Sequence, residues 1–278
     1  MTTGLRERVH IIPLGHEIDR AIIPFKKHRA DRAYVLTVPP TAELSQKMLE
    51  KQKHFTQKVC EGLTSLGVTP TLLYCNMFDI LDSLRVVSSL IVMEKHDKGN
   101  DVFVNMSACG RKTSIAVTLA SMVHGVQAYY VTADRYATGD AAYLETEHGL
   151  SIVEEGRVEP LYNFRIMMPD MPSQQFLVEL YKRKDGMSSK DIFDFFRQIE
   201  IDGYDVTLKK MRKSDEYAPS PQHRILLNRT NRKFLNPLEN AGYIRREWRG
   251  RQFIIHLTES GKYIACISGM VGLPELSK

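Results

Sequence analysis

The stretch from Asp101 to Gly125 joins an apolar run to a helical pattern through small and basic residues. Its first part, Val102–Val104, predicts a buried strand, and apolar residues at helical spacing follow the turn. Small residues let backbone N–H groups approach an anion, and a helix N-terminus adds its positive end. Arg111 and Lys112 lie at that turn. The pattern indicates either a phosphate or nucleotide site, or an ordinary strand-to-helix turn with a solvated Arg-Lys pair.

Several better-known site patterns are missing from this loop and from the rest of the sequence. The spacings GxxxxGK[ST] and GxGxxG do not occur here, and no GxSxG or HExxH supports a general hydrolase. The histidines have no metal-ligand spacing with an acidic pair, so we predict neither a metal nor a cofactor. Cys109 is expected to fill the turn as a small residue rather than to react. His16 is either a turn residue or a ligand contact.

Strands that alternate with helices must position these residues. This alternation predicts an α/β fold with a Rossmann-like, mostly parallel sheet and helices on both faces. Ligands bind at the carboxyl edge of such sheets, where His16 and the loop after Val104 would meet. The strands are expected at Val9–Leu14, Ala33–Val38, Thr71–Cys75, Val102–Val104 and Val126–Thr132, followed by a hairpin-like Tyr136–Val158 and a last strand over Tyr162–Met168. Helices are expected at Glu17–His28, Thr41–Leu66 and Phe78–Glu94.

A second domain is expected after the prolines of Pro169–Ser173, which predict a short, semi-rigid linker. We therefore divide the chain into residues 1–169 and 173–278. The second part predicts three helices, a basic hairpin and a last helix, which is the order of a winged helix-turn-helix domain. These elements are expected at Gln175–Lys184, Lys190–Ile199, Gln222–Asn240 with a kink at Pro237, Tyr243–Leu257, and after Thr258. Ser188-Ser189 and Thr258 are expected to cap the second and the last of these helices.

The positive charge of the chain is confined to this second part. Residues 1–169 contain 19 basic and 19 acidic residues, so the net charge of +5 belongs to residues 170–278. Such an asymmetry indicates a polyanion partner, and the element order favours double-stranded DNA over a solvated basic face or a protein contact. Trp248 is expected to pack under the wing. The candidate DNA-binding residues are Arg224, Asn228, Arg229, Asn231, Arg232 and Lys233 on the helix, and Arg245, Arg246, Arg249 and Arg251 on the wing.

Composition limits the class of protein. A hydrophobic fraction of 43% and a charged fraction of 26% are ordinary for globular proteins. No run approaches the ~18 apolar residues of a membrane span, and the first residues show no secretory pattern. The four cysteines are scattered, as in reduced intracellular proteins. We therefore expect a cytoplasmic protein without a membrane partner.

Three features together resemble CARF-domain regulators, which are CRISPR-associated Rossmann-fold sensors fused to a helix-turn-helix, and in particular an archaeal winged-helix group. The features are VHIIPLGHEIDR, GNDVFVNMSACGRKTSIAVTLAS and the C-terminal winged helix. The resemblance implies a homodimer that binds a cyclic oligoadenylate, such as cyclic tetra-adenylate, across its two-fold axis. The commoner double-glycine turn is replaced by Ala108-Cys109-Gly110. The ligand site predicted in this way comprises Gly15, His16, Ser107, Ala108, Cys109, Gly110, Arg111 and Lys112.

Three functions remain open at this point. The first is a ligand-gated, DNA-binding transcriptional regulator. The second is a ring nuclease that cleaves its cyclic ligand, in which the winged helix mainly dimerises. There the resemblance implies that Lys112 and Ser107 position the 2′-OH for attack on phosphate. The third is a regulator whose first domain binds another nucleotide or only a protein.

Overall fold

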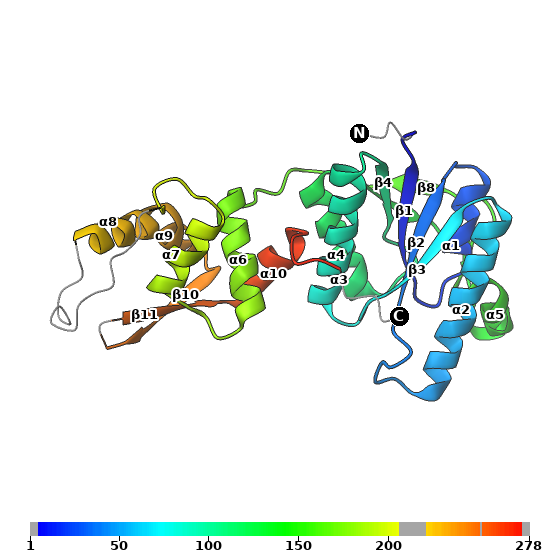
Figure 1. Ribbon diagram of the computed structural model, residues 1–278. Helices are drawn as coiled ribbons and strands as arrows, with labels where there is room; N and C mark the ends of the chain where they lie inside the picture. Colours follow the sequence, from blue (N-terminus) through cyan, green and yellow to red (C-terminus); the bar gives the residue numbers. More distant parts are fainter. Residues whose placement is uncertain (1–4, 206–220, 251, 274–278) are drawn as a thin grey trace. The chain divides into compact units, whose positions relative to one another are not determined.

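The computed structural model describes residues 5–205, 221–250 and 252–273 (Figure 1). The chain divides into two compact units, each described separately below. The first comprises Met1–Met167 and Gly272–Lys278, and the second comprises Met168–Val271.

A six-stranded sheet forms the centre of the first unit, in the order β3-β2-β1-β4-β5-β8. The first five strands in the chain are parallel, and the edge strand β8 runs antiparallel to β5. The chain begins in the middle at β1, moves outward to β2 and β3, and then returns to the other side of β1 with β4. The strands are β1 (Arg8–Pro13), β2 (Arg32–Thr37), β3 (Thr69–Tyr74), β4 (Asp101–Asn105), β5 (Gln127–Val131) and β8 (Val158–Pro160).

Helices cover both faces of this sheet, as predicted. Figure 1 shows α3 and α4 against one face and α1 and α2 against the other. Apolar side chains from α1 and α2 pack on Ile12 and Val35 of the strands and on Leu14, just after β1. The bounds are α1 (Asp19–Ile22), α2 (Gln46–Ser65), α3 (Ile80–Ile91) and α4 (Arg111–His124), with a 3₁₀ turn η1 (Ile23–Lys26) after α1 and a π-helical turn η2 (Val92–Asp97) after α3.

Two predicted elements of the first unit are wrong. The last strand is not at Tyr162–Met168 but at β8, where Leu161 N still donates to Ala128 O at 2.9 Å and ends the pairing. The helix expected over Glu17–His28 is only one α turn and one 3₁₀ turn long, because Pro24, the second residue of the 3₁₀ turn, lacks an N–H for an α-helical bond.

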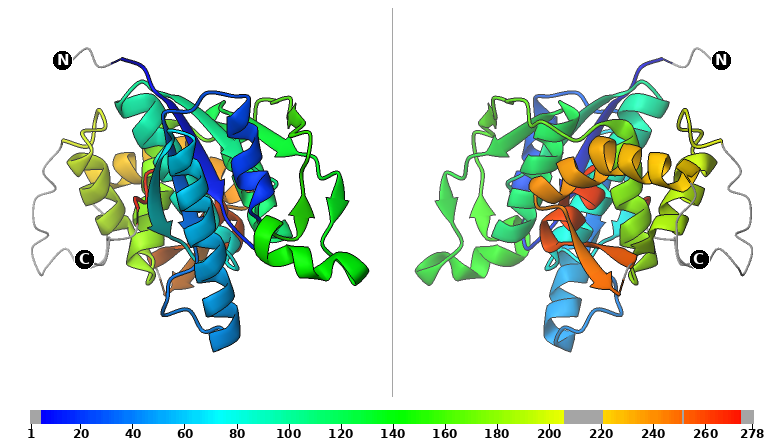
Figure 2. Two further views of the ribbon diagram at one scale, coloured as in Figure 1. Left: turned by 90° about the vertical axis from the view of Figure 1, so that its right-hand side faces the viewer. Right: turned by 90° about the vertical axis from the view of Figure 1, so that its left-hand side faces the viewer.

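The segment after β5 folds back as the expected hairpin. Strands β6 (Arg135–Tyr136) and β7 (Ser151–Ile152) pair antiparallel, and η3 (Gly139–Leu144) and α5 (Glu145–His148) lie between them. Figure 2 shows this green segment beside α1. Leu150 N donates to His16 O at 2.8 Å and Ile18 N donates to His148 O at 3.1 Å. The hairpin thereby holds the loop that leaves β1.

The second unit is a winged helix. Helices α6, α7 and α8 precede the antiparallel wing strands β10 and β11, and α10 follows them. A two-residue strand, β9, adds to β11 and was not predicted. Ser188 and Asp191 form a capping box at the start of α7, which confirms the predicted cap. The bounds are α6 (Met171–Arg183), β9 (Met187–Ser188), α7 (Ser189–Gln198), α8 (Pro221–Thr230), η5 (Asn231–Leu235), α9 (Asn236–Asn240), β10 (Ile244–Arg249), β11 (Gln252–Leu257) and α10 (Glu259–Ile267).

Proline explains two departures from the predicted helices in this unit. Helix α6 begins at Met171, inside the predicted linker, because Pro172 lies in the first turn, where a missing N–H costs nothing. Asp170 caps this helix by accepting from Ser173 N at 3.0 Å. The helix expected over 222–240 does continue to Asn240, but it passes through the π-helical turn η5 just before Pro237.

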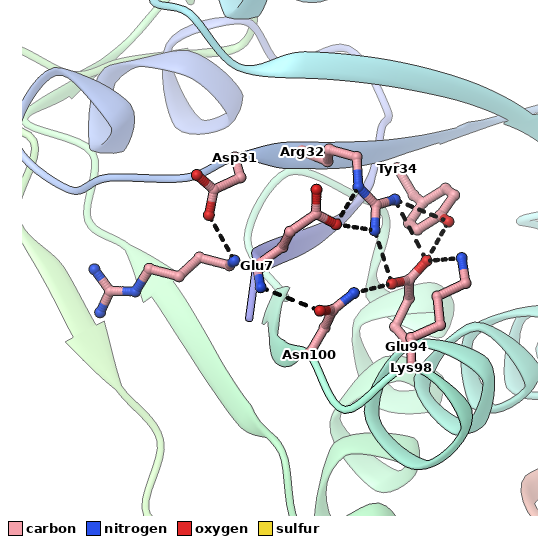
Figure 3. Close-up of polar contacts among 8 residues, drawn as sticks. Glu7, Asp31, Arg32, Tyr34, Glu94, Lys98 and Asn100 are labelled. Carbon is pink, nitrogen blue, oxygen red and sulfur yellow. Dashed lines mark hydrogen bonds and ion pairs between the residues drawn. The ribbon is translucent and has the colours of Figure 1, made fainter. Parts of the chain in front are cut away.

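A buried carboxylate joins η2 to the amino-terminal edge of the sheet (Figure 3). Glu94 is fully buried and accepts hydrogen bonds from Arg32 Nη2 at 2.9 Å and from Asn100 Nδ2 at 2.8 Å. Lys98 Nζ, at 2.9 Å, and the Tyr34 hydroxyl also donate hydrogen bonds to Glu94. Burial raises the pKa of Glu94, but these donors outweigh it and lower the pKa from 4.5 to about 2.

We predict that Glu94→Gln lowers the free energy of unfolding at pH 7 by about 3 kcal/mol, because Arg32 loses a buried charged partner. Since the folded-state pKa lies below the ordinary value, the stability from Glu94 is present above about pH 4.5 and is lost toward pH 2. The difference between wild type and variant should therefore shrink over that interval. Urea unfolding across the pH range measures this, and a constant difference contradicts the account.

We also predict that Gly149→Ala releases the hairpin from the β1 loop. Gly149 has a φ of +85°, and an added Cβ would lie 2.6 Å from Ile18 N and 2.8 Å from His16 O. Both are backbone atoms, so the segment must shift, at a cost of about 2–3 kcal/mol. The matched control is Gly139→Ala, which has a φ of +58° but open space around the Cβ. Hydrogen exchange at the Ile18 and Leu150 amides should accelerate only in Gly149→Ala.

Candidate functional site

Two loops meet at the carboxyl edge of the sheet, where the strand order reverses. Strands β1 and β4 are neighbours, and β1 leads to one half of the sheet and β4 to the other. Gly15 N, after β1, donates to Ala108 O, after β4, at 2.7 Å. The predicted convergence of His16 with the β4 loop is thus present in the geometry. A reversal of this kind is the usual ligand-binding crevice of an open α/β sheet.

The root of the β4 loop is fixed by the buried side chain of Asn105. Its Oδ1 accepts from Ser107 N at 2.9 Å and from Ser107 Oγ at 2.7 Å. Ser107 Oγ in turn accepts from Val131 N at 3.1 Å. Since these bonds use the Ser107 hydroxyl inside the protein, this residue holds the loop and does not line the cavity described below. Lys112, the other member of the expected catalytic pair, does line that cavity.

Helix α4 begins at this loop with an unusual concentration of positive charge. Its N-cap is Gly110, which offers no side chain to the free N–H groups, and its first turn contains no acidic residue. Arg111 and Lys112 occupy that turn, although cations are favoured at the opposite end of a helix. Both are exposed, and neither forms an ion pair with a described residue. The free backbone N–H groups, the helix dipole and the two side-chain charges therefore all favour binding of an anion at this end of α4.

A cavity of about 450 Å³ opens in front of this helix end. One wall is polar and comes from the two loops and α4, and the other is apolar and comes from α2, from the end of β2 and from the segment after β3. This volume lies within the range of small-molecule sites. The lining residues are Gly15, His16, Glu17, Val38, Leu44, Met48, Gln52, Met77, Phe78, Ala108, Cys109, Gly110, Arg111, Lys112, Thr113 and Leu150.

Two residues of the predicted site have properties that the sequence left open. His16 stacks on Phe55 with ring centroids 5.1 Å apart, and burial together with nearby Lys51 lowers its pKa. The imidazole is therefore neutral at pH 7 and can contact a ligand without adding charge. Burial raises the pKa of Cys109 to about 12, so its thiol stays protonated and fills the turn.

An acid-base cluster beneath the cavity was not predicted. Arg20 is buried and donates to Ser107 O at 3.2 Å and to the Tyr130 hydroxyl at 2.9 Å. Glu17, also buried, accepts from Ser151 Oγ at 2.8 Å, and burial raises its pKa. The signal available in the sequence was the charged pair Glu17 and Arg20 in a stretch that otherwise reads as apolar helix.

Some of the candidate DNA-binding residues are exposed, whereas others are buried or bonded to other residues of the protein. Asn228, Arg229, Arg232 and Lys233 line one hollow along α8 and η5, and Arg224 is exposed on α8. The Asn231 Oδ1 is buried, so this atom is not offered to a partner.

On the wing, Arg246 is held inward by Glu239 at 3.3 Å and by Asn236 Oδ1 at 2.6 Å. Arg245 and Arg249 are exposed, while Arg251 lies outside the described residues. Trp248 is 64% exposed on the wing, contrary to expectation.

Neither a metal site nor a membrane-spanning helix is found in residues 5–205, 221–250 and 252–273. No group of three or more His, Cys, Asp or Glu residues there could hold a metal ion. None of the helices there has the length and apolar character needed to cross a membrane.

Solved structures show a distant likeness to the chain. Csm6 from Enterococcus italicus, bound to cyclic hexa-2′-fluoro-hexa-dAMP, is 11% identical over 85% of this chain and 59% of that one, with a TM-score of 0.40. Protein VC1899 from Vibrio cholerae is 12% identical over 93% and 64%, with a TM-score of 0.38. Can2 from Sulfobacillus thermosulfidooxidans, in complex with cyclic tetra-adenylate, is 12% identical over 92% and 61%, with a TM-score of 0.35. The chain thus spans 59–64% of the length of these three proteins.

Two family models match separate parts of the chain, one in each structural unit. Residues 8–136 match the model described as "HFX_2341_N:-like, N-terminal", and residues 172–269 match that of the DUF6293 C-terminal winged helix domain. No curated protein matches the chain. The two-domain order implied by the resemblance to winged-helix CARF regulators is confirmed. The part of the chain before the linker is therefore similar to the HFX_2341_N-like N-terminal model, and the part after it is similar to the DUF6293 C-terminal winged helix domain.

Proposed function

We propose that the protein is a ligand-gated transcriptional regulator whose first domain senses a cyclic oligoadenylate and whose winged helix binds double-stranded DNA. The observation that carries the proposal is the cavity at the sheet reversal. It joins two cations on a helix N-terminus, neither paired with a described acidic residue, to an apolar wall, within a chain that also has a winged helix. We infer that it acts in the cytoplasm, and its archaeal origin stays a prediction.

The two walls of the cavity match the two chemical parts of a nucleotide. Phosphate oxygens would accept from the free N–H groups of α4 and from Arg111 and Lys112. Met77, Phe78 and Leu44 offer apolar surface to a base. A ring of four nucleotides is larger than a cavity of this size. We therefore infer that the ring spans two copies of the chain, each binding part of it, and that the regulator is a homodimer.

Ring cleavage is the alternative function. The cavity includes Lys112 but not Ser107, so the proposed catalytic pair has no support from this arrangement. Chromatography of the ligand recovered after incubation with the protein distinguishes the two functions. Intact ring indicates a sensor, and a linear product indicates a nuclease.

The first prediction for this function concerns coupling between ligand and DNA. Saturating cyclic tetra-adenylate should change the affinity for operator DNA by roughly 5- to 150-fold, because a ligand shared by two subunits alters the spacing of their winged helices. Lys112→Ala should abolish the effect at the same ligand concentration. Lys58→Ala, an exposed lysine on α2, is the matched control and should behave as wild type.

Fluorescence anisotropy of labelled DNA, with and without ligand, measures the coupling. Linear tetra-adenylate controls for charge alone. Equal DNA affinities in the presence of calorimetrically verified ligand binding would show two independent modules and overturn the gated model.

The second prediction concerns the wing. Arg249→Ala should weaken binding to all DNA sequences and lower the slope of log affinity against log salt by about 0.9, the value for one lost phosphate contact. Lys182→Ala, an exposed lysine on α6, removes the same charge away from the wing and controls for net charge. If both variants shift the salt slope equally, the wing does not contact DNA.

A further inference from the structure

A second cavity lies on the α1 face of the sheet, apart from the cavity at the carboxyl edge. Its walls come from η1 and the residues after it, and from β1, β4, β5 and β8. The cavity has a volume of about 260 Å³. It is lined by Arg8, His10, Pro24, Phe25, His28, Arg29, Phe103, Gln127, Tyr129, Val158 and Pro160.

A buried histidine forms part of the wall of this cavity. His10 is 7% exposed and stacks on Phe103 of the neighbouring strand with ring centroids 4.9 Å apart. Its Nδ1 lies 3.1 Å from the Tyr129 hydroxyl, and its Nε2 has no hydrogen-bond partner among the described residues. Burial, then the charges of Arg8 and His28, lower the pKa of His10 to about 3, so the ring is neutral at pH 7.

The Tyr129 hydroxyl indicates which nitrogen of His10 carries the proton. Burial raises the pKa of this hydroxyl, so it stays protonated. Among the described residues, its hydrogen-bond partner is His10 Nδ1. Since a buried hydroxyl needs an acceptor, we assign it as the donor to Nδ1. The neutral imidazole then carries its proton on Nε2, which makes this atom a donor without a described partner in the cavity wall.

Apart from Gln127, the remaining polar side chains of the lining are basic. Arg8, His28 and Arg29 are exposed at the edge of the cavity, and none of its lining residues is acidic. Arg29 pairs with Asp31 at 3.1 Å, whereas the Arg8 guanidinium lies over the Phe103 ring, 5.7 Å from its centroid. The interior surface is aromatic, from Phe25, Phe103 and Tyr129.

We propose that this cavity is a second ligand site, which binds a small organic anion with an apolar, single-ring body. The carboxylate of such a molecule accepts from His10 Nε2 and lies beside Arg8, while its ring contacts the aromatic wall. The volume is below the usual range for drug-sized ligands, which restricts the site to a molecule of about the size of benzoate.

Benzoate is the probe for a first test on the full-length protein. Calorimetry should show saturable binding, and the NMR signals of the His10 ring should shift while those of His16 in the other cavity do not. Benzamide has the same shape without the charge and should bind at least about tenfold more weakly, as expected when a charged hydrogen bond is lost. No saturable binding of benzoate, or equal binding of benzamide, overturns the proposal.

Two substitutions locate the contacts. Arg8→Gln removes the cation at an exposed position and should weaken benzoate binding about tenfold, whereas His10→Phe keeps an aromatic ring and removes the donor. Arg6→Gln is the control, because Arg6 pairs with Asp101 outside the cavity. If Arg8→Gln and Arg6→Gln bind benzoate as wild type does, the cavity is not the site. The conclusion therefore does not depend on whether His10→Phe folds.

Discussion

The arrangement of the carboxyl edge depends on the side-chain amide of Asn105. This residue is fully buried at the end of β4, and both ends of its amide are used. The oxygen holds Ser107, and the nitrogen donates to Arg20 O at 2.9 Å. One amide thereby ties the central strand to its own loop and to α1. Because a buried polar group is costly unless it is bonded, each of these contacts fixes the others. The Asn105 contacts position the loop in which Ala108 O accepts from Gly15 N, and they thereby determine the shape of the cavity.

Much of the fold could be predicted from the sequence because the signals were local. Apolar runs bounded by turn residues predicted the five parallel strands, and the carboxyl ends of β1 and β4 could be placed at one edge of the sheet from topology alone. The winged helix was predictable from the order of helices around a basic hairpin. The caps at Ser188 and Thr258 followed from residue type and position, since both side chains accept bonds from the first turns of their helices.

The features that the sequence could not show arise from contacts between distant segments. Glu94 reads as a solvated residue in a charged helix end, and only its packing against Arg32 makes it a buried ion. Ser107 reads as a ligand contact, yet its hydroxyl is taken by Asn105. Gly149 lies in a polar stretch, and its need for glycine comes from the backbone of residues 16–18. Strand β9 has only two residues, which is too short for periodicity to reveal.

The winged helix carries less free charge than its composition suggests. Glu247 on the wing contacts Arg249 at 2.9 Å and His256 at 3.0 Å, so part of the basic hairpin is neutralised from within. Arg246 is similarly occupied by Glu239. In contrast, Arg224 and Arg232 form no ion pair with a described residue. The surface along α8 and η5 is therefore a more available source of positive potential than the wing.

The π-helical turn η5 has a consequence for how this helix tolerates changes in length. In η5, Asn236 N bonds to Asn231 O, five residues back, whereas an α-helix uses a residue four back. The turn thus accommodates one residue more than a regular turn. Loss of a single residue between 231 and 235 would leave a regular helix and keep the ends of α8 and α9 in step. A deletion, usually disruptive inside a helix, would here remove an irregularity, and we expect the fold of this domain to tolerate it.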